Sequence, residues 1–154
     1  MSLFEGPDVI AFYVRGLPRT QGSVRAVTNR GTGRAMVVQG SSKEAQNGLS
    51  SWREAIAAEG RTWCDAHPAF VPLDGLPLQL KLTFTLARPK SAPKTRRTWP
   101  VGARSGDIDK LARAVLDALT GVLFTDDSQV VGLVTSKDYG TTPGLAVALR
   151  VLAR

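Results

Sequence analysis

Aspartates are concentrated in one short stretch of a chain that is otherwise basic. The formal net charge of the chain is +7, yet residues 106–130, GDIDKLARAVLDALTGVLFTDDSQV, are rich in acidic side chains. Several ionised carboxylates within about 4–6 Å of one another repel unless a cation neutralises them. Oxygen ligands without His or Cys suit Mg²⁺, with Mn²⁺ as the alternative. The stretch therefore indicates a site for a hard divalent cation, with Asp107, Asp109, Asp126 and Asp127 as candidate ligands.

Asp107 and Asp109 stand where a helix is predicted to begin. Two residues of helical rotation amount to about 200°, so the two side chains cannot share one face of a regular helix. In an extended segment that enters the helix, side chains at i and i+2 point the same way. We expect a two-layer packing to bring Asp126 and Asp127, at the start of the next strand, back beside this point. The alternative is that one aspartate is only a favoured N-cap.

Arg113 lies four residues after Asp109, and Asp117 lies four residues further on, so the three side chains share one face of the predicted helix. One interpretation is a ladder of surface salt bridges. The other is catalytic, with Arg113 stabilising the negative charge of a transition state at phosphorus.

The single cysteine, Cys64, and the single histidine, His67, narrow the chemistry. They exclude a disulfide framework, a thiolate zinc site and any mechanism that needs two histidines. Acid–base or metal chemistry must therefore rest on carboxylates. We expect Cys64 to be a partly buried thiol and His67 a surface imidazole near a helix end.

Basic residues occupy two windows without any acid, one between Asp8 and Glu44 and one between Asp74 and Asp107. Two such windows beside an acidic stretch favour a polyanionic partner, because a uniformly solvated surface would mix the signs of charge. The alternative is that basic residues in proline-rich loops only keep the chain soluble. Beside a metal site, the windows point to phosphodiester hydrolysis, in which a metal ion activates water and stabilises the departing oxygen.

The 154 residues fit one domain, which we expect to span residues 1–154. Helical spacing of apolar residues predicts two main helices, one from Ser42 to about Trp63 and one over the AVLDAL stretch, with Gly121 as its C-cap. Alternating apolar residues predict a strand over residues 76–89, and aromatic and β-branched residues predict one over residues 8–16. Strands are also predicted over residues 34–40, 128–139 and 144–152. The order ββαβαββ predicts an α+β fold in which a mixed β-sheet packs with the two helices.

Two pairings of these strands are expected. Residues 34–40 complete a hairpin with residues 8–16, and the long connecting loop carries the first basic window. Residues 128–139 and 144–152, joined at GTTPG, form an antiparallel pair that closes the chain.

No apolar run approaches the roughly 18 residues of a membrane span. The start of the chain, MSLFEGPDVIAFYV, lacks a basic segment followed by a long apolar one. We expect a soluble, cytoplasmic protein without a membrane partner.

The stretch GDIDKLARAVLDALTGVLFTDDSQVVG closely resembles the signature of the RusA family of Holliday-junction resolvases. In that signature an Asp-x-Asp enters a helix, and an AVLDAL helix and an xDDxQV turn follow at this spacing. GLPRTQGSVRA (16–26) is similar to the family's N-terminal Gly-x-Pro, Lys/Gln-Gly, Arg element, and FTLARPKS (84–91) to its strand ending in Arg-Pro-Lys. The resemblance covers most of the chain, and the central motif is its specific part.

The resemblance implies a RusA-like fold and a small homodimeric, Mg²⁺-dependent endodeoxyribonuclease without a small-molecule cofactor. Such an enzyme introduces paired nicks into four-way DNA junctions during recombination and repair, in a bacterial or phage-infected cell. Asp107, Asp109 and Asp127 would be the catalytic carboxylates that bind the metal, with Asp126 as their neighbour. Arg113 stands where the family often has a catalytic lysine, which leaves a charge-stabilising role.

Further departures from the family pattern lie beside these residues. Lys110 stands where an asparagine is common, and Ser105 replaces a frequent basic residue, for which Arg104 compensates. The residues expected to bind DNA are Arg19, Arg25, Arg88, Lys90, Lys94, Arg96, Arg97, Arg104, Lys110 and Lys137. Two other functions fit the same sequence: a non-catalytic, basic nucleic-acid-binding protein, and a nuclease that acts on flaps or other branched DNA.

Overall fold

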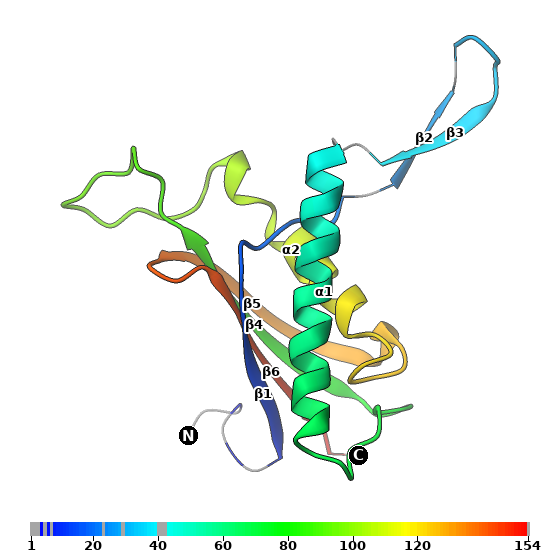
Figure 1. Ribbon diagram of the computed structural model, residues 1–154, viewed down its shortest axis with the longest axis vertical. Helices are drawn as coiled ribbons and strands as arrows, with labels where there is room; N and C mark the ends of the chain where they lie inside the picture. Colours follow the sequence, from blue (N-terminus) through cyan, green and yellow to red (C-terminus); the bar gives the residue numbers. More distant parts are fainter. Residues whose placement is uncertain are drawn as a thin grey trace.

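The computed structural model describes residues 4, 6, 8–22, 24–28, 30–39 and 43–153. Their arrangement confirms the predicted α+β fold, with one mixed sheet and two main helices (Figure 1). The strands and helices in chain order are β1 (Val9–Arg15), β2 (Val24–Thr28), β3 (Ala35–Gln39), α1 (Lys43–Asp65), β4 (Leu78–Ala87), the 3₁₀ turn η1 (Ala103–Ser105), α2 (Ile108–Leu119), the 3₁₀ turn η2 (Asp127–Gln129), β5 (Val130–Gly140) and β6 (Gly144–Val151).

The main sheet has the strand order β1-β6-β4-β5. Strand β4 is central, antiparallel to β6 and parallel to β5, and β1 pairs antiparallel with β6. The expected antiparallel pair of β5 and β6 is therefore wrong, because β4 lies between them. The reason is the connection β4–α2–β5, in which a helical crossover returns the chain parallel to the strand it left.

A separate two-stranded sheet consists of β2 and β3, in which Thr28 pairs with Ala35. The expected hairpin between residues 8–16 and 34–40 is also wrong. Residues 34–40 pair instead with β2, a strand that the sequence reading did not identify. Closing the short loop between β2 and β3 costs less entropy than closing a long one back to β1.

The core lies between the sheet and the two helices, which cover the same face of it (Figure 1). Every second side chain of β4 points into this core, because successive side chains of a strand face opposite ways. Leu78, Leu80, Leu82 and Phe84 are each 0% exposed. The helices contribute Trp52 and Ile56 from α1 and Leu111, Val115 and Leu119 from α2.

Both helices match their predicted positions. Helix α1 begins at Lys43 and ends at Asp65, close to the expected bounds. Helix α2 ends at Leu119, and Gly121 follows with φ of +83°, the left-handed conformation expected of a glycine that terminates a helix. Within the described ranges, no helix is both long enough and apolar enough to cross a membrane.

Candidate active site at the start of helix α2

The backbone that enters α2 is held from two sides. Gly106 has φ of +83°, and a Cβ there would lie 2.5 Å from Thr20 Cγ2, so only glycine fits this position. Lys137 Nζ, from β5, donates to the Gly106 carbonyl oxygen at 2.6 Å and to Ser105 Oγ at 2.9 Å. The segment before β2, through Thr20, and the end of β5, through Lys137, together hold the backbone just before Asp107 in place.

Asp107 occupies the N-cap position of α2 in an extended conformation, with φ of −73° and ψ of 135°. Its side chain makes no capping hydrogen bond. Asp107 Oδ2 instead lies 3.0 Å from Lys110 Nζ, and the side chain is 62% exposed. The N-cap alternative therefore describes the position of Asp107 but not the use of its carboxylate, which is accessible to a ligand.

Asp109 is exposed in the first turn of α2, beside the same ammonium group. The pKa of Lys110 is raised by its hydrogen bond to Asp107, then by the negative charge of Asp107, with a smaller contribution from the charge of Asp109. Both carboxylates thus act on one cation, as expected for two aspartates at i and i+2 around an extended entry to a helix.

The salt-bridge ladder along α2 is not formed among the described residues. Arg113 is exposed and has no ion pair with Asp109 or Asp117. Asp117 instead accepts a hydrogen bond from Gln21 Nε2. Arg113 is therefore an available cation one helical turn from Asp109.

Gln21 joins the GLPRTQG segment to α2. The sequence analysis identified the motif that contains Gln21 but gave this residue no role of its own. Its backbone nitrogen donates to the Lys110 carbonyl oxygen at 3.1 Å, in addition to the side-chain bond to Asp117. Its Oε1 is buried without a hydrogen-bond partner. Among the signals in the sequence, only the similarity to the Lys/Gln-Gly element pointed to this position.

Asp126 and Asp127 lie at the opposite end of α2. Lys137, near the end of β5, contacts the start of α2, whereas Asp127 begins the turn just before β5. Twelve residues of α-helix span about 18 Å. The expectation that all four aspartates meet within one chain is wrong: the described residues contain no group of three or more Asp, Glu, His or Cys able to hold a metal ion. In a parallel crossover the helix runs against the strands, so its start adjoins their ends.

Asp126 already has a structural use. Its Oδ1 accepts from the Ser128 backbone nitrogen at 2.8 Å, and the Gln129 side chain accepts from the Asp126 backbone nitrogen at 3.1 Å, which completes a capping box. The hydrogen bonds from Ser128 lower the pKa of Asp126. Asp127 is exposed like Asp126, and its carboxylate takes no part in the capping box.

The two carboxylates at the start of α2 fit a magnesium ion. Mg²⁺ in enzymes that act on phosphates is held by one or two carboxylates together with the phosphate of the substrate. Asp107 and Asp109 supply that number of exposed oxygen ligands. Cys64 and His67 are not part of this site: the partly buried thiol faces the Val122 carbonyl oxygen at 3.8 Å, and the exposed imidazole stacks on Trp63 at 4.0 Å, as the sequence predicted for both.

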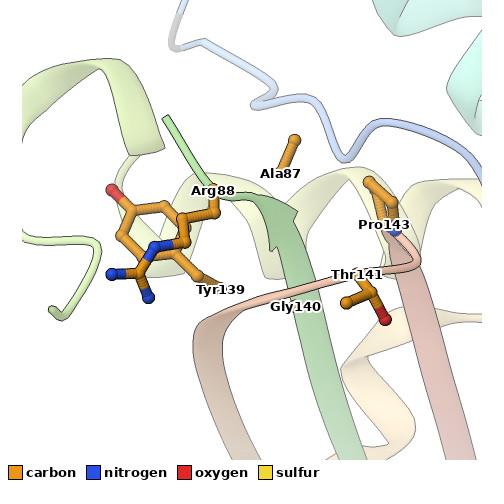
Figure 2. A pocket seen from close by; sticks show the side chains of 6 residues that line it. All are labelled: Ala87, Arg88, Tyr139, Gly140, Thr141 and Pro143. Carbon is orange, nitrogen blue, oxygen red and sulfur yellow. The ribbon is translucent and has the colours of Figure 1, made fainter. Parts of the chain in front are cut away.

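Two hollows lie next to each other at the end of the sheet where β4 and β5 finish. One, of about 290 Å³, is lined by Arg19, Arg104, Ser105 and Tyr139 among others. The second, of about 440 Å³, surrounds the ends of β4 and β5 and the turn into β6, with Arg88 on its wall (Figure 2). Of the predicted DNA-binding residues, Arg19 and Arg104 therefore lie beside the entry to α2, and Arg88 lies at the neighbouring hollow.

Residues 88–102, here called the basic loop, are held in shape by two of their own arginines. Arg88 donates to the Pro93 carbonyl oxygen and to that of Arg96, the latter at 3.4 Å. Arg97 pairs with Asp138 of β5 and stacks on Trp99, with 3.9 Å between the guanidinium carbon and the ring centroid. The remaining predicted DNA-binding residues of the loop, Lys90, Lys94 and Arg96, are exposed.

Three other predicted DNA contacts differ in their surroundings. Lys137 donates hydrogen bonds to Ser105 and Gly106 and so holds the entry to α2, while its contact with DNA stays a prediction. Lys110 is paired with Asp107. The side chain of Arg25 lies outside the described part of the structure. The sequence reading missed Trp99, which is 56% exposed within the basic loop, although an aromatic residue among cations is a known signal for nucleic-acid binding.

Exposed carboxylates flanked by cationic side chains provide what metal-assisted phosphodiester hydrolysis requires. Among known proteins, the model of the family described as Endodeoxyribonuclease RusA matches residues 20–150. A segment of 44 residues is 43% identical to the uncharacterized protein YqaN of Bacillus subtilis (strain 168), and it spans 29% of this chain and 31% of that protein. The family match covers most of the chain, so the chain belongs to the RusA endodeoxyribonuclease family, as its central motif indicated.

Proposed function

We propose that this protein is a Mg²⁺-dependent endodeoxyribonuclease that resolves four-way DNA junctions by paired nicks, in the cytoplasm of a bacterial or phage-infected cell. The observation that carries this proposal is the exposed pair Asp107 and Asp109, whose carboxylates make no capping bond and stand beside cationic hollows. Membership of the RusA family supports it.

In this proposal Asp107 and Asp109 hold the metal ion. A bound Mg²⁺ would supply a polarised water and neutralise charge on the departing oxygen. Arg113 offers a guanidinium on the same helix, and because an arginine stays protonated in proteins, its contribution is charge stabilisation and not proton transfer. Lys90, Lys94 and Arg96 supply the positive charge that holds the DNA backbone beside the carboxylates.

Asp127 can join this pair only from a second copy of the chain, because within one chain it stands at the far end of α2. We propose a homodimer in which Asp127 of the partner subunit completes each site. Two symmetry-related sites also suit a substrate with two-fold character, since each can cut one strand.

The decisive experiment compares the wild type with Asp109→Asn on a synthetic four-way junction, with and without Mg²⁺. Asparagine keeps the size of the side chain but removes its charge, so nicking should fall by orders of magnitude while melting temperature and junction binding persist. Glu59→Gln, which removes an exposed carboxylate of α1, is the matched control and should nick normally. Near-normal nicking by Asp109→Asn would overturn the proposal, and faster cutting of a flap substrate would redirect it to other branched DNA.

A second arm tests the shared site with heterodimers of Asp109→Asn and Asp127→Asn chains, purified through two different tags. If the sites are shared, one site of the heterodimer carries both changes and the other carries neither, so single nicks reappear although each homodimer is inactive. If each site belonged to one chain, both sites would carry one change and no nicking would return. An Asp127→Asn homodimer with normal activity would exclude Asp127 from the site altogether.

A further inference from the structure

Tyr139, near the end of β5, lies between the two hollows at the end of the main sheet. It lines both of them, together with Ala87 of β4. Figure 2 shows its side chain beside Arg88 in the larger hollow, across from Pro143. Among the described residues, no ring or cation stacks on the partly exposed Tyr139 ring. The faces of this ring are therefore available to a ligand.

The ring of Tyr139 stands on the same face of the sheet as the candidate active site. Lys137 and Tyr139 are two residues apart in β5, so their side chains face the same way, about 6–7 Å apart along the strand. Both pair in register with residues of β4 that point into the core below the helices. Lys137 donates to the carbonyl oxygen of Gly106, the residue just before Asp107. Tyr139 is therefore a neighbour of the backbone that presents the Asp107 carboxylate.

The smaller hollow combines the features of a nucleotide site. Its volume of about 290 Å³ is close to the lower limit of ligand pockets, which is roughly 300 Å³. Arg19 and Arg104, both exposed, line it together with Ser105. Aromatic and apolar surface accepts the face of a nucleobase, and guanidinium groups bind phosphates. Besides Tyr139, its apolar lining consists of Leu17, Pro18, Leu86, Ala87 and Pro89.

A base can enter such a hollow only when it has left its stack. In a regular duplex both faces of a base are covered by its neighbours, so neither face can reach a side chain in a concave site. Unstacking costs less where the stacking is already interrupted, as it is where the arms of a junction meet. The chemistry of the hollow therefore suits branched DNA better than regular duplex DNA.

We propose that the smaller hollow holds one unstacked nucleobase of the strand to be cut, with Tyr139 stacked on its face and Arg19 and Arg104 on the neighbouring phosphates. The inference rests on the proposed function, because this base belongs to a nucleotide beside the phosphate that is bound at Asp107 and Asp109. Ser105 lines the hollow and lies two residues before Asp107, so one short segment reaches both parts of the substrate. Stacking on Tyr139 then determines which phosphate reaches the metal ion.

The first test measures the coupling between the ring and a base. Junctions with an abasic site at each nucleotide around the cut are compared for affinity and single-turnover nicking by the wild type, Tyr139→Phe and Tyr139→Leu. Stacking of one base on an aromatic ring contributes about 10-fold to binding. The wild type and Tyr139→Phe should lose about this factor at one abasic position. Tyr139→Leu should lose it on the intact junction and lose nothing more at that position, because the ring is already absent.

Tyr13→Leu is the matched control. It removes a ring that is 40% exposed, from β1 on the opposite face of the sheet, and should respond to every abasic site as the wild type does. Equal melting temperatures of the two leucine variants would establish that the fold survives. If the effects of Tyr139→Leu and of the abasic sites simply add at every position, the base site is overturned, while normal nicking of the intact junction by the wild type leaves the proposed function standing.

The second test is a cross-link that does not depend on cutting. A junction with 5-iodo-2′-deoxyuridine at the coupled position, irradiated on the protein in EDTA, should cross-link to Tyr139, as mass spectrometry of the digested complex would reveal. Cross-links confined to residues outside the hollow, such as the exposed ring of Trp99 in the basic loop, would overturn the base site. A cross-link to Tyr139 in a protein that nicks no junction in Mg²⁺ would keep the base site and overturn the proposed function, so the two failures are distinguishable.

Discussion

Two aspartates at the starts of helical segments have different uses in this protein. Asp107 precedes α2 but leaves the helix uncapped, whereas Asp126 precedes η2 and caps it through Ser128. A carboxylate that accepts backbone hydrogen bonds stabilises the fold, while an exposed carboxylate that makes no capping bond is available to a ligand. Neighbouring aspartates in the same signature therefore divide between structure and chemistry.

Asp126→Ala should lower the melting temperature by about 2–4 °C, because it removes the acceptor for the Ser128 backbone nitrogen. Asp127→Ala is the control in the same turn and should leave the melting temperature nearly unchanged. The pKa of Asp126 is lowered in the folded state by its hydrogen bonds to Ser128. Its contribution to stability is therefore present above the ordinary aspartate pKa of about 3.9 and is lost as the pH falls through the folded-state value.

Thermal melts of both variants across pH check this assignment. The gap between wild type and Asp126→Ala should be full at neutral pH and should close in strong acid. If the gap keeps its size at low pH, or if Asp127→Ala melts lower than Asp126→Ala, the capping role of Asp126 is incorrect.

At the scale of elements, the position of α2 depends on its close approach to α1. Gly60 of α1 is buried, and a Cβ placed there would lie 3.0 Å from Val122 Cγ1 and 3.2 Å from Leu119 Cδ2. The absence of a side chain at Gly60 lets α1 settle against the end of α2. This contact bears on the site because α2 carries Asp109 and Arg113.

Gly60→Val should destabilise the fold by roughly 1–3 kcal/mol, since its methyl groups meet side chains that already fill the space. Gly48→Val is the matched substitution in the same helix, where the nearest atoms belong to the flexible Arg19 side chain at 3.3 Å. It should change stability by about 0.5 kcal/mol or less. Urea unfolding of the two variants measures the difference, and equal midpoints would contradict the tight packing at Gly60.

For the whole molecule, the β2–β3 hairpin and the basic loop project on different sides of the end at which both helices begin (Figure 1). The carboxylates of the candidate site stand at that end, in a chain with net charge +7. Binding of DNA and binding of a cation are therefore assigned to different parts of the molecule. The cationic projections attract the DNA backbone, while the carboxylates between them repel it unless a cation is bound.

Replacing Lys94 and Arg96 together by alanine should weaken junction binding and flatten its salt dependence. Each phosphate contact contributes a slope of roughly −0.9 to log K against log salt, so the slope should lose up to about 2. Arg61→Ala, which removes a cation paired with Glu54 on the far part of α1, is the control and should leave the slope unchanged. Fluorescence anisotropy across salt concentrations gives the slopes, and an unchanged slope in the double variant would assign the two side chains to solubility.

The sequence by itself determined the features that depend on neighbours along the chain. Apolar spacing located both helices, and alternating residues located β4, because each pattern reflects which side of one element is buried. The i and i+2 spacing of Asp107 and Asp109 likewise predicted two carboxylates beside one another at an extended helix entry. The motif around them also identified the family.

Only the tertiary structure decided which distant segments meet. The sequence analysis paired β5 with β6 and brought Asp127 back to Asp107, because in both cases the two partners are close together along the chain. The crossover through α2 instead sets β5 beside β4, runs the helix against the strands, and so separates Asp127 from Asp107 by the length of the helix. Strand order follows from how whole elements bury their apolar faces together, a property of the assembled sheet that no single stretch of sequence contains.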